Sequence, residues 1–306
     1  MTWIKQGLLY SKRHAQLPVV DVLNDRWRVY YSTRVNGRSV PQYLDVDPQK
    51  MLVTGESLTP ILEAGEVGTF DHFGIMPTSI INIAKGIKFM YYVGWSVRTD
   101  VPYHNALGLA ISRDNGETWV KYSNGPVLGC CHWEPGFVGT AEVCFHENES
   151  EFLMYYSSCR HWESVGGKLE PVYDLKIARS VDGINWAGSG TAIMLHPHEG
   201  GIAAARIKRN QLGYFKMWFS VRGKQDYRDN SQNSYRIEGA TSYDGFNWKR
   251  TGPELLASSG ESWDSEMAAY PYVIDNVNGL LMLYNGNGFG RTGIGFATCD
   301  NLDVVF

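Results

Sequence analysis

Three acidic residues stand close to the start of apolar segments that recur along the chain. They are Asp71 in "FDHFGIMP", Glu142 in "GTAEVCF" and Glu266 in "WDSEMAAYPYV". Cleaving a glycosidic bond needs one protonated carboxyl group to assist the leaving group and a second carboxylate across the sugar, roughly 5 to 10 Å away. Two of the three side chains can supply that pair if the fold brings them together, so we predict all three as catalytic residues.

Cationic, amide and aromatic side chains lie near the ends of the same segments and are predicted to bind the substrate. Arginine guanidinium groups suit an anionic group such as a sugar carboxylate or a phosphate, although a structural ion pair stays the alternative for each one. Aromatic rings can stack on sugars, but alternate members of a strand face the core. The predicted substrate-binding residues are His14, Gln16, Arg34, His72, Trp95, Trp162, Arg206, Arg222, Arg236 and Tyr284.

A turn motif that recurs along the chain shows which elements position these residues. "ISRDNGETW", "ARSVDGINW" and "ATSYDGFNW" each join an apolar strand to an Asp turn and then to a Trp that opens the next strand. Asp accepts backbone hydrogen bonds in such a turn while Gly or Asn takes a positive φ, so a structural role is predicted. The aspartates Asp114, Asp182, Asp244 and Asp300 recur every 56 to 68 residues, which indicates a repeat array.

Each repeat contains four apolar or β-rich segments. One segment of each repeat is long and rich in large residues, and its five copies are "RWRVYYSTR", "KFMYYVGW", "EFLMYYSS", "GYFKMWFS" and "LLMLYNGNG". A shorter apolar segment precedes each and a small-residue strand follows, and no pattern of period 3.6 indicates a helix. We therefore predict an all-β, five-bladed β-propeller with four antiparallel strands per blade, formed by residues 1–306 as a single domain.

The N-terminus predicts how such a ring closes. "TWIKQGLL" (Thr2 to Leu9) resembles the fourth strands "TWVKYSNGPVL" and "NWKRTGPELL", yet it precedes the first repeat. We predict that it pairs into the last blade, which removes two exposed sheet edges. The innermost strands of a propeller start at its central channel, so the candidate residues should converge on one mouth.

The composition fits an ordinary globular protein. The chain has 306 residues, 43% hydrophobic and 20% charged, with a net charge of −4. Dispersed Lys and Arg predict no nucleic-acid partner, and the absence of a long apolar run predicts no membrane partner. Five cysteines without C-x-x-C spacing predict reduced thiols and a cytoplasmic location. No cofactor or metal is predicted, since His161, His196 and His198 are too sparse for a metal site.

Together these features resemble the five-bladed glycosidase superfamily of arabinanases, xylosidases, invertases and levansucrases. The stretches "HAQLPVV", "YYSTR", "FDHFGIMPTSI", "YYVGW", "WDSEMAAYPYV" and "YNGNGFG" are more similar to an uncharacterised bacterial, glycosyl-hydrolase-like branch met in surface-polysaccharide gene clusters. The resemblance implies an enzyme that hydrolyses or transfers a glycosyl unit of a small-molecule or oligosaccharide substrate, using carboxylate acid/base chemistry in the central funnel.

The resemblance also implies roles for single residues. The superfamily uses an Asp beside the inner-strand Pro of the first blade as base or nucleophile, a second Asp as pKa modulator and a Glu as general acid. Glu142 matches the third position and Asp71 loosely matches the second, whereas Leu17 stands where the first Asp is expected. We therefore predict Glu142 as the acid and Asp71 or Glu266 as the base. Two alternatives stay open, a non-catalytic glycan or nucleotide-sugar binding propeller and a sialidase-like enzyme acting on an acidic sugar.

Overall fold

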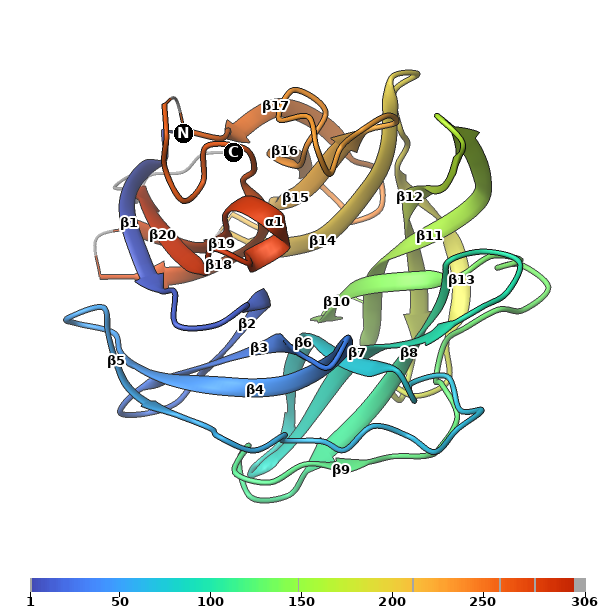
Figure 1. Cartoon of the computed structure of the whole chain (residues 1–306). Helices are drawn as coiled ribbons and strands as arrows, with labels where there is room; N and C mark the ends of the chain where they lie inside the picture. The colour runs from blue at the N-terminus through green and yellow to red at the C-terminus, as the bar shows by residue number, and fades with distance from the viewer. Residues whose placement is uncertain (1, 148, 211, 259, 278, 300–306) are drawn as a thin grey trace.

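The structure, a computed structural model, describes residues 2–147, 149–210, 212–258, 260–277 and 279–299. Within these residues the protein is built of β-strands with one four-residue helix, α1 (Asn287–Gly290), so the all-β prediction is confirmed. The sheets are grouped around a common centre (Figure 1). That helix is far too short to cross a bilayer, and no longer one occurs in the described part. The predicted turn at Asp300 lies outside the described residues.

Consecutive strands pair antiparallel in groups of four. The first two groups are β2 (Gln16–Val22), β3 (Trp27–Val35), β4 (Arg38–Asp47) and β5 (Leu52–Glu56), then β6 (Gly74–Ala84), β7 (Ile87–Val97), β8 (Tyr103–Ser112) and β9 (Val120–Lys121). The next two are β10 (Val138–His146), β11 (Glu151–Val165), β12 (Lys168–Ser180) and β13 (Ala187–Ile193), then β14 (Glu199–Arg209), β15 (Phe215–Gly223), β16 (Arg236–Ser242) and β17 (Lys249–Leu255). A single parallel residue pair, Ser39 with Gly74, joins the first group to the second. Another, Tyr173 with Gly201, joins the third group to the fourth.

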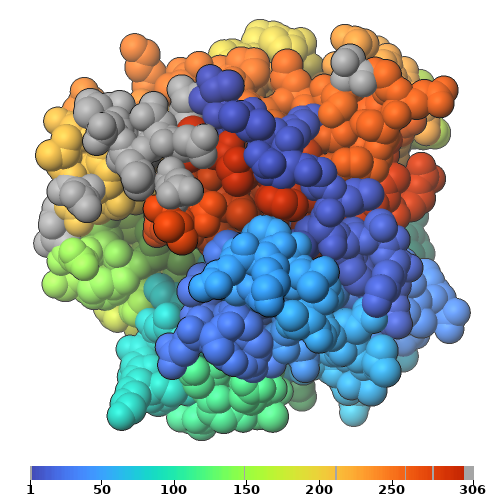
Figure 2. Space-filling view, turned by 90° about the vertical axis from the view of Figure 1, so that its left-hand side faces the viewer, coloured from blue at the N-terminus to red at the C-terminus, as the bar shows by residue number. Residues whose placement is uncertain are grey.

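The remaining sheet combines the two ends of the described chain. It runs in the order β1 (Ile4–Tyr10), β20 (Ile294–Cys299), β19 (Gly279–Asn285) and β18 (Ala269–Asn276). β1 pairs antiparallel with β20, so the predicted pairing of the N-terminal segment is confirmed. The buried Trp3 also packs against Trp218, with 6.1 Å between the centres of the two rings. Figure 2 shows the dark blue N-terminal segment lying against the red and orange C-terminal part.

The core lies between neighbouring groups of strands and is rich in aromatic residues. Leu153 and Tyr155 of β11, for example, share a buried cluster with Met217 and Phe219 of β15. Because side chains alternate between the two faces of a strand, the large residues of each second strand fill the spaces on both sides of its sheet. The aromatic residues that the sequence places on these strands are therefore used mainly for packing between sheets.

The three described Asp turns, around Asp114, Asp182 and Asp244, connect neighbouring groups of strands. Asp182 Oδ1 accepts hydrogen bonds from the backbone N–H groups of Ile184 and Asn185, both 2.8 Å long, as expected for a structural turn. The carbonyl of the adjacent Gly183 accepts a 2.6 Å hydrogen bond from the Tyr91 hydroxyl of β7, in the preceding sheet group. Tyr155 with Gly245 and Tyr30 with Gly116 repeat this contact at 2.7 and 3.0 Å.

β-bulges interrupt the first strand of each group at nearly the same level. Leu17, Ala204 and Tyr270 have positive φ values of 61°, 52° and 57° where the pairing register shifts. Their backbone N–H groups are captured instead by side chains, at 2.8 Å by Asn285 Oδ1, 2.7 Å by Thr140 Oγ1 and 2.7 Å by Ser220 Oγ. Bulges re-aim side chains, and backbone strain of this kind gathers at functional sites.

Candidate functional site

A cavity of about 350 Å³ lies where these bulges meet. Every strand that opens a group contributes a lining residue, namely Gln16 of β2, Met76 of β6, Thr140 of β10, Ala203 of β14 and Tyr270 of β18. The cavity therefore occupies the region where the starts of the innermost strands converge. Its volume is typical of a site for a small ligand.

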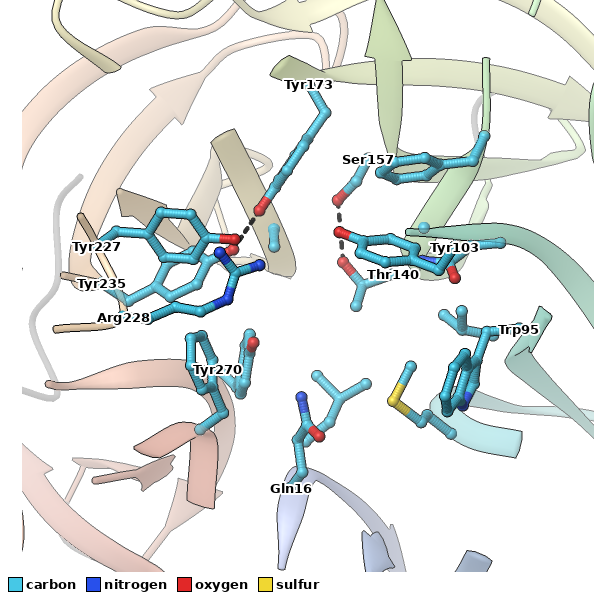
Figure 3. Close-up of a pocket in the computed structure, with 18 of the residues that line it drawn as sticks. Gln16, Trp95, Tyr103, Thr140, Ser157, Tyr173, Tyr227, Arg228, Tyr235 and Tyr270 are labelled. Carbon is cyan, nitrogen blue, oxygen red and sulfur yellow. Dashed lines mark hydrogen bonds between the residues drawn. The ribbon is translucent and has the colours of Figure 1, made fainter. Parts of the chain in front are cut away.

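One wall of the cavity combines aromatic and hydroxyl groups. Trp95 near the end of β7 and Tyr103 at the start of β8 line this wall, together with Ser157 of β11. Thr140 and Ser157 share a hydrogen bond of 3.0 Å between their hydroxyl groups (Figure 3). Flat rings beside hydroxyl groups can contact both the apolar faces and the hydroxyl groups of a sugar.

Tyrosines dominate the opposite wall. Tyr173, Tyr227, Tyr235 and Tyr270 gather there with Arg228 (Figure 3). The hydroxyl groups of Tyr173 and Tyr235 are hydrogen-bonded to each other. Burial raises the pKa of Tyr235 well above its usual value, so this phenol keeps its proton at neutral pH.

Four of the predicted substrate-binding residues line the cavity: His14, Gln16, Arg34 and Trp95. His14 Nε2 lies 3.0 Å from the carbonyl oxygen of Phe289, and burial lowers the pKa of this imidazole. Arg34 donates a 2.7 Å hydrogen bond to Ser39 Oγ, and its guanidinium carbon lies 5.5 Å from the centre of the Trp95 ring. The sequence thus identified part of the lining from residues next to strand ends.

Glu142 lies two residues beyond the lining residue Thr140 on β10. Its Oε2 accepts hydrogen bonds from Arg206 Nη1 at 2.6 Å and Ser79 Oγ at 3.1 Å. Burial raises the pKa of Glu142, although Arg206 and Ser79 oppose the change. Arg206 also stacks 4.4 Å from the Tyr272 ring centre, and its buried Nε and Nη2 have no hydrogen-bond partner among the described residues.

The other two predicted catalytic residues have different surroundings. Asp71 is 1% exposed, and its Oδ2 accepts hydrogen bonds from Lys121 Nζ at 2.6 Å and the Tyr92 hydroxyl at 3.2 Å. Glu266 is exposed in the segment before β18, where its backbone N–H is bonded to Asn287 Oδ1 at 2.8 Å. Neither residue lines the cavity, and Glu142 does not either. The structure therefore does not gather the three carboxyl groups around this cavity.

Two further predicted residues lie near the lining without being part of it. Arg222 is fully buried behind Tyr173 and Tyr227, with its guanidinium carbon 3.8 Å from the centre of the Tyr227 ring. Trp162 packs with its ring centre 5.2 Å from that of Tyr103, which does line the cavity. These two side chains support the walls.

The remaining predicted residues are held by structural contacts. Arg236 forms ion pairs of 2.9 Å with Glu199 and 2.8 Å with Glu238, as the structural alternative for an arginine anticipated. Tyr284 is fully buried and donates a 2.9 Å hydrogen bond to Asp264, which leaves it no surface for a substrate. His72 is half-buried, with Nδ1 3.0 Å from the Thr69 carbonyl oxygen and its ring against Phe73.

None of the four tyrosines of this wall was predicted from the sequence, and neither was Arg228. Tyr227 and Arg228 lie in the connection 224–235 between β15 and β16. The corresponding connection between β3 and β4 is only 36–37. A long insertion at the predicted mouth, with an adjacent Tyr and Arg, was the available signal. No group of His, Cys, Asp or Glu in the described ranges is arranged to hold a metal ion.

No family model matches the chain. Two curated proteins from strains of Mycobacterium tuberculosis, "Uncharacterized protein MT1551" and "Uncharacterized protein Rv1502", are each 33% identical to it. The alignments cover 98% of this chain and 100% of each relative. The chain therefore belongs to the family of these mycobacterial proteins. Since the match spans the whole relatives, the family shares the fold described above.

The fold of this chain is similar to those of solved glycoside hydrolase structures. A structure described as "Glycoside hydrolase" has a TM-score of 0.75 and 19% identity, covering 99% of this chain and 94% of its own. A structure of the GH130 family of mannoside phosphorylases reaches 0.66, with 13% identity over 94% and 84% of the two proteins. A fructofuranosidase from Schwanniomyces occidentalis complexed with fructose also reaches 0.66, with 12% identity over 96% and 58%. At these identities the likeness concerns the fold alone.

Proposed function

We propose that this chain is a carbohydrate-active protein that binds a glycosyl unit in the cavity. The observation that carries the proposal is the lining itself, in which Trp95 and Tyr103 stand beside the hydroxyl groups of Thr140 and Ser157. Aromatic faces with a few polar groups are the usual surroundings of a bound sugar. The glycosidase-like fold supports the same conclusion.

We also propose that the groups of four strands are the blades of one five-bladed propeller, made by residues 1–306 as a single domain. The support is the pairing of β1 with β20, which joins the ends of the described chain in one sheet. The sequence resemblance suggests a role in surface-polysaccharide metabolism, and the cysteine usage suggests a cytoplasmic location.

For the chemistry, we propose that the chain hydrolyses or transfers the bound glycosyl unit and that Glu142 supplies the proton. Burial raises the pKa of this carboxyl group, as a general acid requires, and it follows the lining residue Thr140 on the same strand. The role of base stays with Asp71 or Glu266. Asp71 and Glu142 each pair with a cation at 2.6 Å and Glu266 is exposed, but only Glu142 shares a strand with a lining residue, Thr140, so it is the best supported of the three.

Replacing Glu142 tests this chemistry. We expect Glu142→Gln to lower the rate about 10²- to 10⁴-fold, because glutamine keeps the shape but has no transferable proton. The assay is a panel of aryl glycosides and nucleotide sugars, run with and without phosphate. Glu147→Gln is the control, since this exposed carboxylate lies just beyond the end of the same strand. Equal turnover by the parent and Glu142→Gln would remove Glu142 from the proposal.

A non-catalytic binding protein is the second candidate. It is favoured by one observation, that no carboxyl side chain occurs among the described residues that line the cavity. This candidate predicts that the parent and Glu142→Gln cleave no member of the panel, while both bind one glycan with the same affinity. Cleavage of any member of the panel by the parent protein excludes a purely binding role.

A further inference from the structure

Positive charge at the cavity exceeds the negative charge paired with it. Arg34 and Arg228 line it, and Arg222 is buried directly behind two of its tyrosines. Of these three, only Arg228 forms an ion pair among the described residues, with Glu170. A site of this kind attracts anions, because its walls exclude water and focus the field of the arginines.

Arg222 is the most unusual of the three, because it is 0% exposed. Its donors are used by neutral oxygens, with Nη1 bonded to the Gly223 carbonyl at 2.9 Å and Nη2 to the Pro171 carbonyl at 2.6 Å. No acidic side chain in the described ranges is within ion-pair distance of it. A buried charge without a counter-charge is costly. A negative group bound in the adjacent cavity would offset part of that cost.

Arg222 also donates to a pair of tyrosines that line the cavity. Its Nε donates a 3.1 Å hydrogen bond to the Tyr173 hydroxyl oxygen. That oxygen and the hydroxyl of Tyr235 are hydrogen-bonded to each other. The two phenols hold two protons and their mutual bond uses one of them, so the other has no acceptor among the described contacts. Both tyrosines line the cavity, where that O–H group is free to donate to a ligand.

We infer that the glycosyl unit bound in this cavity carries an anionic group, a carboxylate or a phosphate, held by Arg228 and the Tyr173–Tyr235 pair with Arg222 behind them. This inference rests on the proposed function. The opposite side of the cavity, with Trp95 and Tyr103, is left for the ring of the sugar. Arg34 lies beside Trp95 and adds a further positive charge that attracts an anion. Burial lowers the pKa of this guanidinium, and it has no ion pair in the described ranges.

Matched pairs of ligands test the inference by isothermal titration calorimetry. The pairs are 4-nitrophenyl glucuronide with 4-nitrophenyl glucoside, 4-nitrophenyl galacturonide with 4-nitrophenyl galactoside, and glucose 1-phosphate with glucose. We expect the anionic member of at least one pair to bind about 10- to 100-fold more tightly, as for hydrogen bonds to a charged group. A preference confined to the uronides identifies a carboxylate, and one confined to glucose 1-phosphate identifies a phosphate.

Arg228→Gln locates the anion, and Arg179→Gln is its matched control. Both arginines have side chains that are 43% exposed, and each pairs with a glutamate that is 11% exposed. Only Arg228 lines the cavity. We expect Arg228→Gln to lose most of the preference for the anionic ligand, because its affinity for the anionic member falls far more than its affinity for the neutral member. Arg179→Gln should bind both members as the parent does.

The outcomes separate this inference from the proposed function. If neutral sugars bind and no anionic partner binds more tightly, the inference is overturned and the proposed function stands. An anion preference that survives in Arg228→Gln overturns the assignment to this wall. If no sugar of either kind binds, the proposed function fails with it.

Discussion

The Asp turns and the cavity both contain tyrosines and loop residues, but the repeats are alike at the turns and differ around the cavity. At the turns the same contact occurs three times in the described structure, as Tyr30, Tyr91 and Tyr155 each donate to a glycine carbonyl. Around the cavity no two first strands contribute the same lining residue. Positions that the repeats keep alike therefore hold the sheets together. Positions where they differ provide the chemical character of the site.

The largest effect is expected at the contact that joins the two ends of the described chain. Deleting residues 1–9 removes most of β1, the buried Trp3 and the Lys5–Asp264 ion pair of 2.6 Å. Loss of a buried Trp alone costs about 3–5 kcal/mol, so we expect the deletion to lower the melting temperature sharply. Ile4→Ala is the control, because Ile4 is 53% exposed on the same strand. A deletion variant that melts like the parent would refute the closure by β1.

Tyrosine-to-phenylalanine changes compare the two regions directly. Tyr91→Phe removes the donor to the Gly183 carbonyl and leaves that acceptor buried, at a cost of about 1–3 kcal/mol. We expect denaturant unfolding to show this loss, while sugar binding by the folded protein stays unchanged. Tyr235→Phe should do the reverse, weakening binding of the anionic ligand with a smaller loss of stability. If both variants lose affinity for the anionic ligand equally, the turns and the cavity do not have separate roles in stability and binding.

A smaller effect is expected from pH. Hydrogen bonds from Thr118 and Ser112 hold the pKa of Asp114 at about 2, and that of Asp244 is also about 2, since turn N–H groups outweigh its burial. Folded pKa values below the ordinary one give stability that is present above about pH 4 and lost as the pH falls toward 2. Asp114→Asn should flatten that part of the stability curve, measured by urea unfolding at each pH. Glu147→Gln, which alters an exposed carboxylate that is not part of an Asp turn, should leave that part of the curve unchanged.

Features set by local chemistry could be predicted from the sequence. The Asp turns depend on a few adjacent residues, and the second strands are recognisable because they are long and rich in large side chains. The N-terminal strand was identified by its likeness to fourth strands. His14, Gln16, Arg34 and Trp95 were found because they adjoin strand ends at one mouth.

Features set by tertiary contacts could not be predicted. The pairing of Asp71 with Lys121 depends on how the segment before β6 packs against β9, which residue types do not reveal. Tyr227 and Arg228 reach the cavity only because the connection 224–235 lies over it. The environment of Glu142 depends on Arg206, 64 residues away in the chain. Burial and charge at these positions follow from the arrangement of whole sheets.

The sugar site can be located with a crystal structure of the protein in complex with the tightest-binding sugar of the panel. We expect the sugar ring to lie in the cavity beside Trp95 and Tyr103, with its polar groups toward Arg228 and Tyr235. A sugar bound elsewhere on the protein, with this cavity empty, would show that the cavity is not the glycosyl site.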